Sequence, residues 1–590
     1  MGAFFLFRSE SSLDLPGAKK VFSEKGFAAP NEYRLADRTL WLYRKMLPGT
    51  DNFFSDDGGA SVFCCGTLAY RGLGYRASLV RLLADFRAGA IDQDRLQGNF
   101  CALFWDGRSI TLLADSQNAQ HVFMDESGDC LSSSFLAVLA ASPNRRQIHR
   151  AAALEKLATG CIVGPDTLVE GIQQVDAALL ASLPEKTGIQ VIPRGSLRAD
   201  RDFHREGFED SVQRQVDALR RYFADIQALH EEQSGELGLS SGFDSRLLLA
   251  LSRSFGAPIP LHTHCSGTAH DEEIRIVEKL ARLGNHVLAK VPTRQMEAME
   301  EGRFREVLHD NLYFFDGRCC NDMGSYSETY TAGYRKQVLG PNRLSYSGLG
   351  GEIFRNGFGT PGHRFAWSAW LGSMVFYPFA WEAVGGAEPA ERLHRSIDRK
   401  VALRLGIEWP RRADRYLTRA YYAAVRMPDC ASNVANAYGQ VAFVLTPFIE
   451  RPIMEEALRG DPYIGSGGAY EAAMIDRISP ELAAVESHYG FPFSRVPATH
   501  LLQTGLRGWT PLELRRQRMR WLNRDEQRNG EWRRYREHVS ASPALQDLHA
   551  VLRETFPDAD WSIAMRHFAQ RWTAISVGSF LKEFQSKLKG

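Results

Sequence analysis

The residues at positions 236–250 combine the side chains and the spacing of an anion-binding loop. A short apolar run predicts a buried strand, which continues through Ser240, Ser241 and Gly242 into a leucine-rich helix. Such an abrupt turn leaves backbone N–H groups at the positive end of the helix dipole, where small residues let a phosphate oxygen approach. The Ser245 hydroxyl adds a donor. The segment therefore predicts a nucleotide-phosphate site, and a serine-rich helix cap without chemical function fits it as well.

One acidic residue in this loop, Asp244, would repel phosphate unless a cation lay between them. Mg²⁺ is usually held by one or two carboxylates together with phosphate oxygens. Segment 343–354 repeats the pattern with a predicted strand, three glycines and then the carboxylate of Glu352. Two strand-end carboxylates facing one pocket would hold a magnesium ion, so we expect Asp244 and Glu352 to lie close together.

The composition is that of an ordinary globular protein. The 590 residues suggest two to four domains, and 44% hydrophobic with 24% charged residues suffices for large cores. A formal net charge of +1 predicts neither a nucleic acid nor a membrane as partner. Nine cysteines without Cys-x-x-Cys spacing, and no signal peptide at the start, favour a reducing cytoplasm.

Two further segments have distinctive compositions. Residues 365–381 carry no charge and many aromatic side chains, but the stretch is short for a membrane span and contains Pro378. We expect it to form the wall of an acyl-substrate pocket with Tyr377, and apolar core explains it equally well. The arginines of 515–536 are interspersed with acidic residues, which favours a solvated helix face over a docking site for an acidic peptide, a carrier protein or RNA.

The order of predicted elements indicates an α/β fold. Residues 1–194 have a mostly β pattern with short helices, including an antiparallel meander over 100–124. After a polar connector, strand, helix, strand, helix and strand follow one another over 236–291, which is typical of a doubly wound parallel sheet. From about residue 360 the chain is expected to be largely helical.

Residues 239–245 resemble the Ser-Gly-Gly-x-Asp-Ser loop of the PP-loop ATP pyrophosphatases. Residues 347–352 and the later Thr446-Pro447-Phe448 resemble two segments of the asparagine synthetase branch, and motifs between 96 and 135 resemble its glutamine amidotransferase domain. The resemblance implies three parts. These are an inactive αββα domain like the Ntn amidohydrolases at 1–200, a PP-loop synthetase domain at 205–500, and a helical C-terminal extension at 501–590.

Members of that family form amide bonds with ATP and Mg²⁺. A carboxylate attacks the α-phosphate, pyrophosphate leaves, and an amine displaces AMP from the acyl-adenylate. The resemblance implies that Asp244 and Glu352 hold Mg²⁺, and that the charge growing on pyrophosphate is stabilised by the first loop. It also implies these nucleotide-binding residues: Leu239, Ser240, Ser241, Gly242, Phe243, Ser245, His264, Gly348, Gly350 and Gly351.

The chain departs from the family at the residue that would hydrolyse glutamine. Gly2 stands where glutamine-dependent relatives have their nucleophilic cysteine, so we expect no glutamine hydrolysis. Leu349 stands where relatives have a glutamate or tyrosine that takes a proton from the amine. Tyr346, His264 and Glu382 are the candidate replacements, and an amine that is already deprotonated would need none.

The other departures from the family lie at positions that contact the phosphates in its members. No lysine occurs in 469–477, where relatives carry one that steadies the transition state, and Arg477 is the candidate replacement. Ser241 stands where relatives have glycine.

Three functions remain open. The first is an adenylating amide ligase of specialised biosynthesis, similar to the β-lactam synthetases and lasso-peptide cyclases. It would act on a small molecule or peptide that carries a carboxylate and an amine, alone, as a homo-oligomer, or with a carrier protein or precursor peptide. The second is ammonia-dependent amidation of a sugar acid or amino acid. The third is a pseudoenzyme that binds nucleotide or a partner without turnover.

Overall fold

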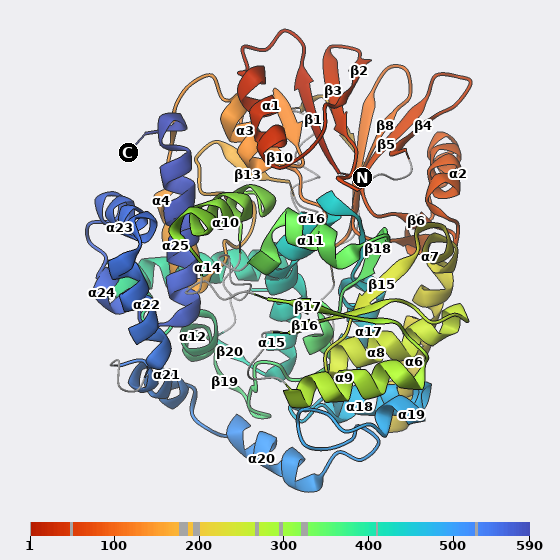
Figure 1. The fold of residues 1–590 in the computed structure, drawn as a ribbon, viewed down its shortest axis with the longest axis vertical. Coiled ribbons are helices and arrows are strands. Elements are labelled where there is room, and N and C mark those ends of the chain that lie inside the picture. Colours follow the sequence, from red (N-terminus) through yellow and green to blue (C-terminus); the bar gives the residue numbers. More distant parts are fainter. Residues whose placement is uncertain are drawn as a thin grey trace.

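The computed structural model describes residues 2–47, 51–175, 187–192, 197, 201–265, 271–293, 299–319, 328–408, 411–524 and 529–589. The chain is a mixed α/β protein in which N-terminal, largely antiparallel sheets lie beside a parallel sheet and many helices (Figure 1). The α/β class with a parallel sheet, predicted from the alternation of strands and helices, is confirmed. None of the helices in these ranges is both long and apolar enough to cross a membrane.

Two N-terminal sheets face each other across apolar side chains such as Phe4 and Leu103. The first sheet has the order β13 (Ile172–Gln174), β10 (Phe123–Asp125), β11 (Cys130–Ser132), β1 (Ala3–Arg8), β3 (Arg38–Tyr43), β2 (Asn31–Leu35). The second has the order β14 (Gln190–Val191), β9 (Ile110–Ala114), β8 (Phe100–Trp105), β5 (Ser61–Gly66), β4 (Phe53–Ser55). Because strand side chains alternate between faces, the outer faces pack under helices. These are α1 (Leu15–Glu24) and α3 (Phe135–Ala141) on the first sheet and α2 (Tyr75–Arg87) on the second.

The predicted antiparallel meander over 100–124 is wrong in its last strand. Strands β8 and β9 form the expected hairpin, but β10 pairs with β11 and β13 in the other sheet. The carboxylate of Asp115 explains this change, because it accepts hydrogen bonds of 2.8–2.9 Å from the N–H groups of Gln117, Ala119 and Gln120. Those bonds fold the connection that carries the chain from one sheet to the other.

The parallel sheet has β15 (Gly235–Gly238) at its centre. Its full order is β17 (Leu288–Pro292), β16 (Leu261–Cys265), β15, β18 (Leu344–Tyr346), β21 (Phe443–Leu445). From β15 the chain first adds β16 and β17 on one side and then β18 and β21 on the other. This is the doubly wound order that places a ligand site at the carboxyl ends of β15 and β18, where the direction of winding reverses.

Helices surround this sheet and make up much of the remaining described chain. Those beside the sheet are α6 (Phe208–Asp225), α7 (Gln227–Gln233), α8 (Phe243–Ser252), α9 (Asp271–Leu283), α10 (Glu301–Phe314), α11 (Ala332–Leu339), α16 (Ser432–Val441), α17 (Arg451–Arg459), α18 (Ala469–Ile478) and α19 (Pro480–Ala483). Others are α4 (Arg150–Thr159), α12 (Trp367–Trp370), α13 (Ala380–Ala383), α14 (Ala387–Leu405) and α15 (Arg415–Tyr421). The last are α20 (Ala498–Gly508), α21 (Leu512–Leu522), α22 (Gly530–Ala541), α23 (Pro543–Thr555), α24 (Trp561–Ala564) and α25 (Phe568–Glu583).

The last helices are tied to the N-terminal region. Helix α25 packs on α4 and α23, and its apolar side chains share one core with α1 and α3 (Figure 1). Strand β22 (Leu588–Lys589) pairs with β12 (Arg146–Gln147). The residues expected as a separate C-terminal extension therefore complete a core that begins near residue 3.

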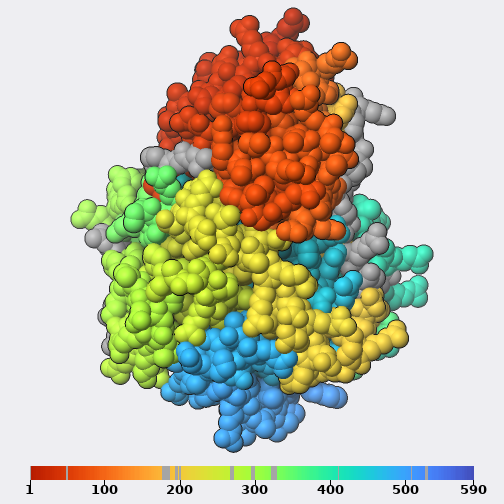
Figure 2. Space-filling view, turned by 90° about the vertical axis from the view of Figure 1, so that its right-hand side faces the viewer, coloured from red at the N-terminus to blue at the C-terminus, as the bar shows by residue number. Residues whose placement is uncertain are grey.

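The N-terminal sheets also rest on the helices that precede β15. Figure 2 shows the orange N-terminal residues directly against the yellow α6 and α7. The N–H of Tyr75 donates to Glu232 of α7 at 2.5 Å, and Arg95 pairs with Asp225 of α6 at 2.8 Å. Polar contacts at the start of α2 and at Arg95, which follows that helix, thus hold α6 and α7 against the N-terminal sheets.

A buried lysine lies at this junction. Lys45 is 6% exposed, its ammonium donates to the carbonyl of Gly439 in α16, and it lies 5.1 Å from the Phe443 ring centroid. Burial lowers the pKa of Lys45 to about 7, although the nearby thiols of Cys65 and Cys64 oppose the shift. Charging this lysine therefore costs folding free energy.

We expect Lys45→Met to remove a pH dependence of stability. Between a folded pKa of about 7 and the ordinary value of 10.5, unfolded chains bind more protons than folded ones, so the free energy of unfolding rises with pH. From pH 7 to 9 the wild type should gain about 2 kcal/mol relative to Lys45→Met. Thermal melting at both pH values measures this, with the exposed Lys20→Met as control. Equal pH dependence in wild type and Lys45→Met would contradict the assignment.

Candidate active site

Two loops meet at the carboxyl ends of neighbouring parallel strands. The first follows β15 and enters α8, and the second follows β18 and enters the 3₁₀ helix η7 (Gly351–Phe354). A side chain at Gly351 would collide with the carboxylate of Asp244, and one at Gly348 would come within 3.0 Å of its Cβ atom. Gly350 has a left-handed backbone (φ +95°) and packs against Ile449. The glycines of the second loop therefore allow it to touch the first.

Three carboxylates lie near the guanidinium of Arg355. Its Nη2 atom is 3.0 Å from both oxygens of Asp244, and Nη1 is 3.4 Å from Oε2 of Glu471 on α18. Glu471 is fully buried, and neither of its oxygens accepts a hydrogen bond from a residue in the described part of the chain. Glu352 is exposed and accepts a hydrogen bond from the Tyr422 hydroxyl at 2.5 Å. The structure thus brings Asp244 and the Glu352 loop together.

Burial and charge shift the pKa values of this cluster. Burial raises the pKa of Asp244; Arg355 opposes the shift, and Glu352 adds to it. Burial also raises the pKa of Glu471 well above its ordinary value, again against Arg355. Burial alone would lower the pKa of Arg355, but the carboxylates raise it above its ordinary value. One guanidinium therefore lies among three carboxyl groups, two of which have raised pKa values.

The two strand-end carboxylates fit a magnesium ion that shares its coordination with phosphate. Asp244 and Glu352 supply oxygen ligands, which Mg²⁺ prefers, and Asp244 would exchange Arg355 for the ion. Over the described ranges, no group of three or more His, Cys, Asp or Glu side chains is arranged to hold a metal.

The first loop makes hydrogen bonds to itself. The hydroxyls of Ser240 and Ser245 are 2.9 Å apart, and Ser245 Oγ accepts the N–H of Ser240 at 3.0 Å. The N–H of Gly242 donates to the Ser240 hydroxyl at 3.3 Å. The sequence predicts unpartnered N–H groups here, and the structure instead gives those of Ser240 and Gly242 partners inside the loop. A phosphate would have to replace these weak internal bonds.

Ser241 differs more strongly from the prediction. Its side chain is fully buried, with Oγ 2.7 Å from Nδ1 of His488 and 3.1 Å from Oε1 of Glu273. Its N–H donates to the same Glu273 oxygen at 3.3 Å. A buried hydroxyl needs such partners, so this one is turned away from any ligand in the loop. Glu273 nevertheless places an anion at the start of α8, where the helix dipole favours one.

Three of the residues predicted to bind nucleotide serve packing in this structure. Leu239 is buried at the end of β15. The Phe243 ring stacks on Phe493 with centroids 3.9 Å apart and so fixes α8 against the segment that follows α19. His264, at the end of β16, stacks on Tyr334, and its Nδ1 atom lies 2.9 Å from the tyrosine hydroxyl. Only His264 remains exposed.

Two predicted catalytic side chains do not reach the cluster, which corrects those assignments. Tyr346 is buried behind the sheet, with its hydroxyl 3.1 Å from Nδ1 of His230. Arg477 pairs with Glu209 of α6. It lies six residues after Glu471, which at 3.6 residues per turn places the two side chains on different faces of α18.

The candidate base Glu382 is also elsewhere, paired with Arg520 of α21 at 2.5 Å. Sequence reasoning missed Arg355, Glu471 and Tyr422. Arg355 follows directly after the predicted loop segment 343–354, and Glu471 lies within 469–477, where the family lysine was expected. No sequence pattern pointed to Tyr422, because it is 70 residues from Glu352, whose carboxylate it contacts.

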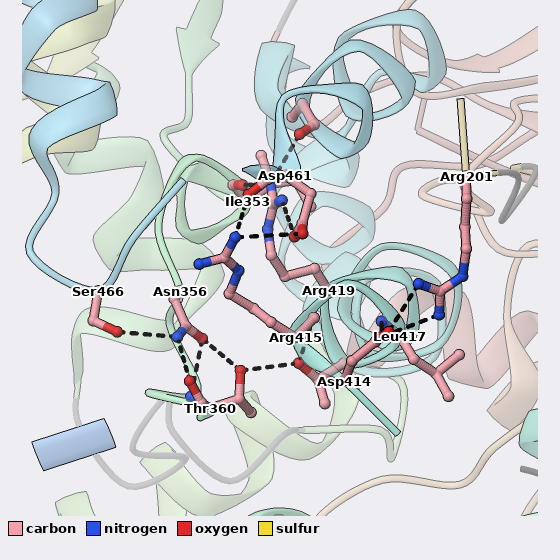
Figure 3. A network of polar contacts seen from close by, with 12 residues as sticks. Arg201, Ile353, Asn356, Thr360, Asp414, Arg415, Leu417, Arg419, Asp461 and Ser466 are labelled. Atoms are coloured by element: carbon pink, nitrogen blue, oxygen red, sulfur yellow. Dashed lines mark hydrogen bonds and ion pairs between the residues drawn. The ribbon is translucent and has the colours of Figure 1, made fainter. Parts of the chain in front are cut away.

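A buried network holds the second loop in place (Figure 3). Arg419 of α15 pairs with Asp461 at 2.7 Å and donates to the carbonyl of Ile353 at 2.6 Å. Asn356 donates to Ser466 at 3.0 Å and to the carbonyl of Thr360 at 2.8 Å. These bonds tie the residues after Glu352 to α15 and to the segment before α18, so they fix both Glu352 and Glu471.

A cavity of about 260 Å³, here called the outer cavity, lies beside this cluster. It is lined by Leu349, Glu352, Ile353, Arg355, Gly357, Phe358, Arg419, Tyr422, Arg426, Met427, Cys430 and Ala431. A substrate in this cavity would lie next to Glu352, within reach of a nucleotide bound at the two loops.

The structure also bears on the predicted loss of glutamine hydrolysis. A Cβ atom at Gly2 would collide with the carbonyl oxygen of Arg44 and lie 2.6 Å from the Phe27 ring. The backbone here leaves no room for a nucleophilic side chain.

No family model matches this chain, and no curated protein matches it in sequence. Among solved structures, NMN synthetase from Francisella tularensis is similar at 15% identity over 37% of this chain and 93% of its own. The TM-score is 0.17. At that score the similarity carries no argument about fold or function.

We expect Arg355→Ala to destabilise the protein by about 3–5 kcal/mol, since it leaves buried carboxyl groups without their cation. The double variant Arg355→Ala with Glu471→Gln should recover part of that loss, because it removes one uncompensated charge. Thermal melting measures both, and the exposed Arg399→Ala serves as a matched control. Equal melting temperatures for the single and double variants would show that Glu471 and Arg355 are not coupled.

Proposed function

We propose that this protein is an ATP-dependent ligase that adenylates a substrate carboxylate and passes the acyl group to an amine. The contact of Asp244 with the glycines that precede Glu352 supports this most directly. It gathers two acidic side chains at the point where the winding of the parallel sheet reverses, which is where such sheets bind nucleotides.

In this proposal the phosphates of ATP bind at the start of α8, where the helix dipole favours an anion. The phosphates displace the Glu273 carboxylate and open the hydrogen bonds between Ser240 and Ser245. Asp244 and Glu352 hold Mg²⁺, which when bound neutralises phosphate charge. Arg355, rather than Arg477, would be the cation of the site, and it would stay paired with Glu471 if a metal ion replaced it at Asp244.

The chemistry follows from where charge develops. An oxygen of the substrate carboxylate bonds to the α-phosphorus, and the bond to the β-phosphate oxygen breaks with its electron pair leaving on pyrophosphate. N–H groups at the first loop and Arg355 stabilise that leaving group more than they stabilise ATP. The amine nitrogen then bonds to the acyl carbon, the bond from that carbon to the phosphate oxygen breaks as AMP leaves, and the released amine proton passes to solvent. Because Gly2 leaves no room for a nucleophile, the amine comes from the substrate or from solution, not from glutamine.

A nucleotide-binding pseudoenzyme is the second candidate. The internal bonds of the first loop, with Glu273 at its anion site and Arg355 on Asp244, favour it. A protein without turnover would keep these contacts when nucleotide is present.

ATP–pyrophosphate exchange scanned over carboxylic acids separates the two candidates. For the ligase, one class of acids supports exchange, and Asp244→Asn and Glu352→Gln each lower its rate by about 100-fold or more, as for loss of charge stabilisation in a transition state. The exposed Asp210→Asn and Glu391→Gln are matched controls and should retain wild-type rates. ATP binding without pyrophosphate exchange for any acid would contradict the ligase function and support the pseudoenzyme.

A further inference from the structure

A second cavity, here called the inner cavity, adjoins the outer one. It has a volume of about 270 Å³ and shares Phe358 and Arg426 with the outer cavity. Its other lining residues are Thr159, Ser373, Met374, Val375, Phe376, Tyr377, Pro378, Tyr421, Arg516, Met519, His567 and Ala569. Together the two cavities extend from Glu352 to side chains of the C-terminal helices. Part of the charge-free stretch 365–381 is thus a cavity wall.

π-Helical turns line both cavities. The segment η9 (Tyr422–Ala431) places Tyr422, Arg426 and Cys430 along the outer cavity. The segment η8 (Leu371–Val375) lines the inner cavity with its last three residues. π-Helices are rare because their hydrogen bonding is less favourable than that of α-helices, and they occur frequently at functional sites. Two of them around one pair of cavities indicate a built binding site rather than a packing defect.

The inner cavity is mainly apolar and aromatic. Phe358 stands at the junction, with its ring edge-on to Trp370 at 5.3 Å between centroids. Two buried nitrogens of inner-wall residues, Nδ1 of His567 and Nε of Arg516, make no hydrogen bond to any residue in the described ranges. A buried nitrogen of this kind is costly unless a ligand or water supplies the missing partner.

Arginines outnumber acidic residues in the linings, although Arg355 pairs with Asp244 and Glu471, and Arg419 pairs with Asp461. Glu352 is the one acidic residue among the residues that line the two cavities, against the guanidinium groups of Arg355, Arg419, Arg426 and Arg516. Arg426 belongs to both linings, so its guanidinium lies where the two cavities meet. A carboxylate near Arg426 would be next to the residues that hold the nucleotide.

We propose that the two cavities bind the acid that the proposed ligase adenylates, and that this acid has an aromatic or similarly apolar body. This inference rests on the proposed function. The carboxylate lies in the outer cavity between Arg426 and Glu352, and the body extends past Phe358 into the inner cavity. A hydroxyl at the far end of the body donates to Nδ1 of His567. A short polar acid would leave the apolar inner cavity unfilled.

The test measures binding and exchange separately. Calorimetry with the full-length protein, Mg²⁺ and a non-hydrolysable ATP analogue uses 3-(4-hydroxyphenyl)propanoate as the probe and succinate as the short polar comparison. We expect the probe to bind at least about tenfold more tightly than succinate, as burial of an aryl group implies. Arg426→Ala and Ser373→Trp, which remove the cation and fill the inner cavity, should each weaken probe binding by about tenfold or more. The exposed Arg399→Ala should not change it.

The outcomes distinguish this inference from the proposed function. Affinity for the ATP analogue and the melting temperature show whether each variant is folded. Probe binding no tighter than that of succinate, or unaffected by both cavity variants, overturns the inference. Exchange with succinate alone would support the proposed ligase function and contradict an aryl acid as its substrate. Variant-sensitive probe binding without exchange for any acid would support the binding site and overturn the ligase.

Discussion

The close approach of Asp244 to the second loop is the contact on which the rest of the site depends. Strands β15 and β18 are neighbours, so their following loops leave the sheet side by side. They can touch only because Gly348 and Gly351 present no side chain to Asp244. A Cβ atom at Gly351 would collide with the Asp244 carboxylate, and one at Gly348 would come within 3.0 Å of its Cβ atom, so a side chain at Gly351 would push the loops apart.

That contact brings acidic side chains close together, and neighbouring residues offset the resulting repulsion. Arg355 neutralises the cluster in part, and the Arg419 network fixes the backbone that carries Glu352. Buried charges held this way contribute little net stability, but removing one partner is expensive. Two further charged groups contact the first loop, since Glu273 accepts a hydrogen bond from the N–H of Ser241 and Arg355 pairs with Asp244.

The loop motifs and the strand order could be predicted from the sequence, but the side chains that contact the site residues could not. The first loop, the second loop and the parallel order of the strands follow from short apolar runs, glycines and carboxylates in sequence. Arg355 lay just beyond a recognised segment and Glu471 lay within one, but which way each side chain points depends on helix phase and packing. For the same reason Arg477 was placed wrongly. Strand β10 was misplaced because a carboxylate, Asp115, redirects the chain between sheets.

The sequence by itself determined which residues could do chemistry at the strand ends, since glycine, serine and carboxylate side chains act through local backbone geometry. It also determined the α/β class, because hydrophobic period is a local property. Tertiary structure alone decided that Tyr422 meets Glu352, that two π-helical turns enclose adjoining cavities, and that the last helix completes the N-terminal core. Those contacts join segments tens to hundreds of residues apart, and their free energy comes from packing and desolvation that no local pattern records.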